Sequence, residues 1–174
     1  MAKFRDGMLG PTVILFAICL VITFAMAGTY QATVSVIAQS EIDAANEVRQ
    51  VVLPDAGTFT VIEKALPNGI EQAFKADNGQ GYVFRSVAKG FGGPVTYYIG
   101  IDQSGNFVGI SMFDHSETPG LGSKVSNAEY LEGYYGGAEI DGVDAITGAT
   151  ITSTSLKNAL RQALEAYNLV KEGA

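Results

Sequence analysis

A long uncharged segment near the N-terminus is the feature that most limits how this chain can fold. No charged residue occurs between Asp6 and Glu41, and residues 8–30 inside this window are almost wholly apolar. A helix that crosses the hydrocarbon core of a bilayer needs roughly 20 such residues. The sequence therefore predicts a transmembrane helix over residues 9–30, preceded by a short segment of residues 1–8.

The charges around this segment predict its orientation. Lys3 and Arg5 lie just before it, and the next cation along the chain is Arg49. Cationic residues beside a membrane span are retained on the cytoplasmic side. We therefore expect a single-pass protein of the cell (inner) membrane, with a cytoplasmic N-terminus and an extracytoplasmic main domain.

A cleaved signal peptide is the alternative interpretation of the same segment. Ala25-Met26-Ala27 has the small-x-small form of a cleavage site and follows a basic and then an apolar region. Against cleavage, a weakly apolar helical pattern continues from Ala32 to Ile37. We therefore favour a retained anchor.

The remainder of the chain reads as a helical connector, residues 31–54, and one compact domain, residues 55–174. Pro54 ends the connector because proline cannot continue a helix. Strand-like runs over residues 82–88, 95–101 and 107–113 follow, and the turn formers of residues 102–106 predict a hairpin between the last two. Residues 126–129 resemble a capping box that opens a short helix, and apolar residues at helical spacing from Leu156 to Tyr167 predict a closing helix. Strands grouped ahead of helices predict an α+β fold with an antiparallel sheet.

Charge and composition exclude several classes of function. Residues 1–30 carry a net charge of +1, so the rest of the chain carries −8 to give the total of −7. An acidic domain without a basic stripe repels nucleic acid, and we expect no such partner. One cysteine, Cys19, and one histidine, His115, leave no ligand set for a Cys-based or His-rich metal site, and no metal is predicted.

The segment of residues 144–153, DAITGATITS, is the most informative stretch for function. Gly148 and Ala149 leave the backbone at Thr150 open to close approach by another molecule. The hydroxyl-rich residues 152–155 stand at the expected start of the closing helix, where the helix dipole and unpaired amides favour a phosphate. The segment lacks the lysine of a nucleotide-binding P-loop. On local chemistry alone it could equally be a helix cap made of threonine and serine.

A second segment, residues 115–122, reads HSETPGLG. Pro119 fixes φ and Gly120 can take a positive φ, so the pair predicts a tight turn. Glycines let a backbone pack against a flat ring, and Leu121 supplies apolar cover. Alone, this segment could be no more than a turn that leaves a hairpin.

Together the two segments resemble the motifs of the FMN-binding domain family, Asp-x-x-Ser/Thr-Gly-Ala-Thr and His-x-Glu-Thr-Pro-Gly-Leu-Gly. The first is matched at Asp144, Thr147, Gly148, Ala149 and Thr150. The family includes the G subunit of Rnf complexes and the C subunit of the sodium-pumping NADH:quinone reductase. The resemblance implies that a flavin transferase places FMN on the Thr150 hydroxyl as a phosphoester. It also implies that Glu117, Thr118, Gly120, Leu121 and Gly122 lie against the flavin. Residues 89–94 resemble a glycine-rich turn of the family, for which a loop between two strands is the preferred interpretation.

The resemblance spans nearly the whole chain and implies a membrane-anchored electron-transfer subunit. The chain is short for the quinone-reductase subunit, which favours the Rnf branch, where electron flow between ferredoxin and NAD is coupled to ion movement. The expected partners are the other membrane subunits of such a complex and, during maturation, the flavin transferase. No catalytic acid, base or nucleophile is expected, because the flavin ring carries the chemistry. The alternatives are the quinone-reductase subunit and, from another class, an anchored binding module without redox activity.

Overall fold

The computed structural model describes residues 9–54, 56–137 and 139–171. The expected N-terminal segment, residues 1–8, lies outside the described residues. The chain divides into two compact units, residues 1–45 and residues 46–174. Residues 46–54, which we expected to belong to the connector, are thus grouped with the sheet domain.

Helix α1 covers Leu9–Val52. Its part up to Ala45 belongs to the first unit, and its last turns belong to the second. Its segment Gly10–Tyr30 is 21 residues long with a mean hydropathy of 2.4. At 1.5 Å per residue this segment spans about 30 Å, the thickness of a bilayer core. Its large apolar side chains are exposed, as expected of a helix that faces lipid. Length and composition are therefore those of a membrane anchor, although a signal sequence would meet the same criteria.

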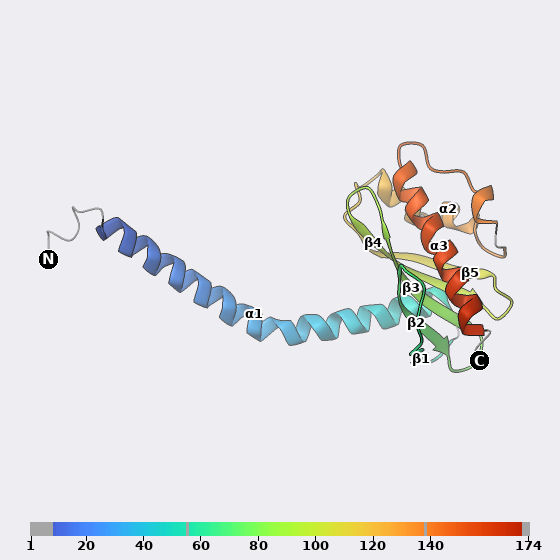
Figure 1. Ribbon diagram of the computed structural model, residues 1–174, viewed down its shortest axis with the longest axis horizontal. Helices are drawn as coiled ribbons and strands as arrows, with labels where there is room; N and C mark the ends of the chain where they lie inside the picture. The colour runs from blue at the N-terminus through green and yellow to red at the C-terminus, as the bar shows by residue number, and fades with distance from the viewer. Residues whose placement is uncertain (1–8, 55, 138, 172–174) are drawn as a thin grey trace. The chain divides into compact units, whose positions relative to one another are not determined.

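The second unit is built on an antiparallel sheet with the strand order β1-β2-β3-β4-β5 (Figure 1). The strands are β1 Phe59–Val61, β2 Ile70–Ala76, β3 Gly81–Lys89, β4 Pro94–Asp102 and β5 Phe107–Asp114. The three predicted strands correspond to β3, β4 and β5, and the predicted hairpin joins β4 to β5. Strands β1 and β2 were not predicted. The α+β prediction is confirmed.

Helix α3, Thr150–Lys171, packs along one face of this sheet against β2, β3 and β4 (Figure 1). It is the predicted closing helix, and its apolar stripe forms the core with inward-facing strand residues. The fully buried members of this core include Phe84, Tyr97, Ile99, Ile101, Leu156, Ala159, Leu160 and Ala163. The Tyr97 hydroxyl approaches Ser155 near the start of α3, and Tyr167 bonds the Gln103 carbonyl near its end. Helix α3 therefore runs in the same direction as β4.

The opposite face of the sheet receives the last turn of α1. Gly100 and Gly109 are paired across β4 and β5, and a Cβ added to either would stand 2.2 Å from the Val52 carbonyl oxygen. The two glycines thus let the helix backbone lie directly on the sheet. Val52 and Leu53 are buried there, and the Arg49 guanidinium stacks 3.8 Å from the centre of the Phe74 ring.

The short helix after β5 begins differently from the prediction. Helix α2 covers Ala128–Glu132 and follows the 3-10 helix η2, Gly122–Ser126. Asn127 is the N-cap, without a side-chain capping bond, and the Ser126 hydroxyl donates instead to the Ser123 carbonyl. The predicted capping box is therefore not formed, because Ser126 belongs to the preceding helical turn.

Candidate functional site

Three segments that are distant in sequence meet at one end of the sheet. The glycine turn, residues 90–93, joins β3 to β4. The exit turn, residues 115–122, follows β5 at the same end, because Asp114 pairs with Thr96 near the start of β4. Helix α3 begins at this end, so the attachment loop, residues 146–150, arrives there as well. The fold thus gathers both sequence motifs and the third glycine-rich segment in one place.

The attachment loop is a tight turn fastened to the helix that it opens. The Ala149 amide donates to the Ile146 carbonyl at 2.9 Å, and the Ile146 amide donates to the Ser153 hydroxyl at 3.1 Å. Gly148 has a φ of +83°, which glycine adopts without strain. The Ala149 carbonyl accepts the first helical bond, from the Ser153 amide at 2.9 Å. Thr150 therefore stands at the first position of α3, exposed, where the leading amides have no intrahelical acceptor.

The exit turn is held by its own hydrogen bonds. The Thr118 carbonyl accepts from the Leu121 amide at 3.1 Å, and the Gly120 amide donates to the Ser123 hydroxyl at 2.9 Å. Gly120 has a φ of +77°, as the Pro-Gly pair predicted. His115 shapes the start of the turn, since its Nδ1 accepts from the Glu117 amide at 3.2 Å. A Cβ on Gly148 would lie 3.6 Å from Leu121, so the exit turn touches the attachment loop.

We call the place where the three segments meet the junction. Glu117 lies inside it rather than on its surface. Its side chain is only 5% exposed, and its oxygens accept from the Thr152 hydroxyl at 2.6 Å and from the Gly92 amide at 3.0 Å. Burial alone would raise the pKa of the carboxyl, but hydrogen bonds from Thr152, Gly92 and Phe91 outweigh it, so the pKa lies below its usual range. Glu117 is therefore ionised at neutral pH.

Each part of the junction carries an exposed apolar side chain. Ile151 is 54% exposed, Leu121 is 49% exposed and Phe91, in the glycine turn, is 70% exposed. Leu121 belongs to the exit turn, and Ile151 directly follows the attachment loop in α3. Exposed apolar side chains of this kind favour a flat apolar ligand over water.

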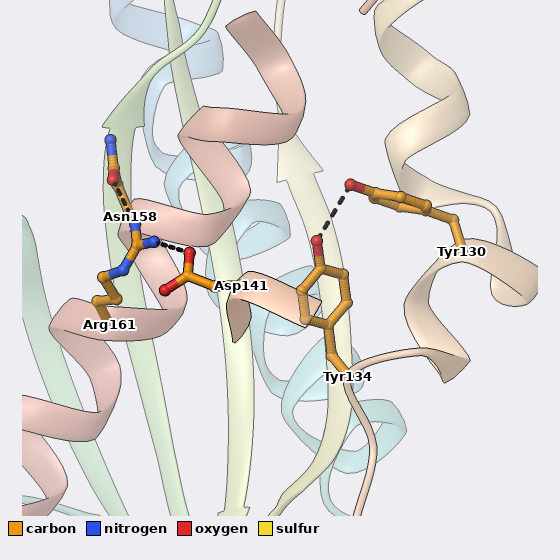
Figure 2. Close-up of polar contacts among 5 residues, drawn as sticks. All are labelled: Tyr130, Tyr134, Asp141, Asn158 and Arg161. Atoms are coloured by element: carbon orange, nitrogen blue, oxygen red, sulfur yellow. Dashed lines mark hydrogen bonds and ion pairs between the residues drawn. The ribbon is translucent and has the colours of Figure 1, made fainter. Parts of the chain in front are cut away.

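The chain that leads into the attachment loop is tied to α3. Arg161 of α3 donates to Asp141 in the 3-10 helix η3, Ile140–Gly142, and at 3.0 Å to Asn158 (Figure 2). Figure 2 also shows the hydroxyls of Tyr130 and Tyr134 in contact at 3.0 Å. Asp141 is mostly exposed, so its ion pair contributes at most about 1 kcal/mol to stability. Its main effect is to hold η3 beside α3.

The structure places the predicted site residues in two groups. Exposed at the junction are Thr147, Gly148, Thr150, Thr118, Gly120 and Leu121, whereas Ala149, Gly122 and Glu117 are buried. Phe91 and Ile151 were not predicted as site residues, and Thr152 was expected only among the hydroxyls of residues 152–155 at the start of the closing helix. Their signal is weak in sequence, because an exposed Phe or Ile and a buried Thr are recognised only once their neighbours are known.

Comparisons with known proteins find similar sequences over these segments. The FMN-binding domain family matches residues 90–165, a range that includes all three segments. The chain is 28% identical to the G subunit of the proton-translocating ferredoxin:NAD(+) oxidoreductase complex of Clostridium ljungdahlii, with 95% of each chain covered. It is 30% identical to the G subunit of the Na(+)-translocating complex of Acetobacterium woodii, with 91% of each covered. Among solved structures, Shewanella oneidensis NqrC is similar, with 21% identity, a TM-score of 0.47 and coverage of 71% of this chain and 73% of that one.

Proposed function

Because the chain belongs to the family of G subunits of ion-translocating ferredoxin:NAD(+) oxidoreductase complexes, we propose that it is a membrane-anchored electron-transfer subunit with FMN esterified to Thr150. The observation that carries the proposal is the exposed Thr150 hydroxyl at the first position of α3, inside the segment matched by the FMN-binding domain family. When bound, FMN supplies one- and two-electron chemistry, and the protein sets its position and potential.

The residues at the junction fit both ends of FMN. The leading amides of α3 and the helix dipole suit a phosphate ester on Thr150. Phe91, Leu121 and Ile151 offer apolar surface for the isoalloxazine ring. The buried carboxylate of Glu117 bonds to Thr152 and Gly92, so it does not face the phosphate as a free anion. Direct contact of Glu117, Thr118, Gly120, Leu121 and Gly122 with the ring stays a prediction.

Attachment requires a donor and leaves a defined product. A flavin transferase would use FAD, and the Thr150 oxygen would form a bond to the phosphorus on the riboflavin side. The bond between that phosphorus and the AMP portion breaks, AMP leaves, and the hydroxyl proton is released. The chain gains one FMN less one water. A tether of this kind keeps the cofactor on a domain outside the cytoplasm, where lost FMN could not readily be replaced.

The experiment that tests this proposal measures the flavin on the native protein. Purified from its own cells and denatured, the chain should show flavin absorbance that stays with the polypeptide, and its intact mass should show the stated gain. An anchored binding module without redox activity would show neither. Co-purification of other membrane subunits with ferredoxin:NAD activity would support the assembly, whereas a quinone-reductase assembly would contradict it.

We expect the FMN domain on the extracytoplasmic side, as the charges of Lys3 and Arg5 predict. Glu165, exposed on α3, is a suitable place for a reporter cysteine in a Cys19→Ala background. Asp77 is less suitable, because its carboxylate accepts hydrogen bonds from Thr58 and Thr60. Glu165→Cys should react with an impermeant maleimide in whole cells or, for a Gram-negative host, in spheroplasts. Reaction only after lysis would reverse the orientation.

Gly120→Val should disturb the flavin environment while leaving some covalent attachment in place. A β-branched residue is strained at a φ of +77° by about 1–2 kcal/mol or more, so the exit turn should distort. Gly136→Val is the matched control, because Gly136 has a φ of +73° and, like Gly120, open space at its Cβ. Its amide bonds to Phe107 at the opposite end of β5. Visible circular dichroism should change in the first variant only, and an unchanged spectrum in Gly120→Val would place the exit turn away from the ring.

A further inference from the structure

The least expected group in the junction is the buried carboxylate of Glu117. A carboxylate removed from water is costly unless every oxygen is bonded. Here one oxygen accepts from the Gly92 amide, the other accepts from the Thr152 hydroxyl, and the Phe91 amide adds a further hydrogen bond. These donors lie 25 and more residues away in sequence. One side chain thus joins the glycine turn, the exit turn and the first turn of α3.

The space around this carboxylate is made by two glycines. A Cβ on Gly90 would stand 2.3 Å from one Glu117 oxygen, and a Cβ on Gly122 would stand 2.3 Å from the other. Both positions are buried and neither has a positive φ, so turn geometry does not account for these glycines. They leave room for the carboxylate.

We propose that Glu117 is a positioning residue, whose carboxylate holds the glycine turn and the exit turn on the first turn of α3 and thereby fixes Thr150 and the apolar side chains around it. This inference rests on the proposed function for its consequence, since the positioned group is the flavin attachment site. The contacts themselves do not depend on the flavin. Phe91 precedes Gly92, whose amide donates to Glu117, and Leu121 precedes Gly122, which lies against the Glu117 carboxylate. A change in Glu117 should therefore displace these two apolar side chains as well.

Substitutions of Glu117 and of its partner Thr152 should have different effects on the junction. Glu117→Ala removes every bond to the carboxylate and leaves the Gly92 and Phe91 amides without their acceptor. Glu117→Gln keeps the size of the side chain but removes its charge. The glutamine side chain has one acceptor oxygen in place of two, so it can accept a hydrogen bond from Gly92 or from Thr152 through that oxygen. Thr152→Val removes one bond at nearly constant volume, and Thr152→Ser restores it. Glu165→Gln, on the exposed side of α3, is the matched control for a lost carboxylate.

The first test measures the contact without any flavin. In a full-length Thr150→Ala background, the melting temperatures of Glu117→Ala, Thr152→Val and the double variant form a double-mutant cycle. Because the two side chains share a hydrogen bond, the double variant should melt no more than marginally below Glu117→Ala. Additive losses would show that the two residues act independently and would overturn the inference. This result does not depend on whether FMN is attached to the protein.

The second test measures positioning on the native protein with its transferase present. Glu117→Ala should lower the fraction of chains that carry covalent FMN by about tenfold, Thr152→Val by less, and Thr152→Ser and Glu165→Gln should match the parent. Glu117→Gln keeps the side-chain size and so tests positioning in a protein that still folds. Its flavin-bearing fraction should show altered visible circular dichroism and a more positive midpoint potential. If Glu117→Gln keeps the parent fraction, spectrum and potential, the carboxylate does not position the site. If the parent itself carries no flavin, the proposed function fails while the first test still stands.

Discussion

Thr150→Ala should abolish denaturation-resistant flavin altogether. The phosphoester needs the Thr150 oxygen, and alanine provides no atom that could replace it. Because Thr150 is exposed and its side chain makes none of the hydrogen bonds that fasten the attachment loop, the fold should persist with little change in melting temperature. Intact mass should equal that of the bare chain, and the purified protein should be colourless after denaturation. This is the largest functional effect that the structure predicts.

Two controls make the result specific to one hydroxyl. Thr147→Ala removes the other exposed hydroxyl of the motif and should leave a substantial flavin-bearing fraction, because Thr147 lies in the turn before α3 begins. Thr150→Ser keeps an oxygen at the same position and should retain some attachment. If Thr150→Ala stayed coloured after denaturation while Thr147→Ala did not, the ester would belong to Thr147.

The motif residues were predictable because each set is nearly continuous in sequence. The exit turn carries its own signal in Pro119 and Gly120, and the attachment loop carries its signal in Gly148 and the hydroxyls that follow. That the two loops meet at one site was implied only by the family resemblance. Local chemistry does not indicate that Leu121 lies beside Gly148, since this contact depends on the direction in which α3 crosses the sheet.

The burial of Glu117 was not predictable from the sequence. Beside threonine, proline and glycine, a glutamate reads as a solvated residue of a turn or as a ligand contact. Its burial depends on donors from the glycine turn and from α3, which no local pattern joins to it. The glycine turn was expected to be a loop between strands, and it is one. Its Phe91 and Gly92 amides also donate hydrogen bonds to Glu117.

Strands β1 and β2 were not predicted for a different physical reason. Strand β1 has three residues, too few to show alternation. Strand β2 pairs with β3 through an irregularity between Ile70 and Gln72, so its buried positions do not alternate along the strand. The signal that sequence reading relies on is therefore absent from both.

The sequence also offered no reason for Gly100 in β4 and Gly109 in β5, which the structure places against Val52.

Gly109→Val should detach the last turn of α1 from the sheet. A Cβ at Gly109 would stand 2.2 Å from the Val52 carbonyl oxygen and 2.5 Å from its Cα, which are backbone atoms and cannot rotate away. Val52 and Leu53, 1% and 4% exposed, would return to water. Each such side chain contributes about 1.5–3 kcal/mol when buried, so the domain should lose about 3–6 kcal/mol of unfolding free energy.

Flavin attachment is the property that this substitution should spare. Helix α3 and the core beneath the attachment loop pack on the opposite face of the sheet, so the Thr150 junction keeps its contacts. Hydrogen exchange should therefore quicken at residues 49–53 while the fraction of chains with covalent FMN stays near the parent value. Gly137→Ala is the control, because its Cβ meets no atom within 4 Å and its φ is not positive. Slow exchange at residues 49–53 in Gly109→Val would show that the glycine pair does not seat the helix, whereas joint loss of the helix contact and of the flavin would show that the two faces of the sheet are coupled.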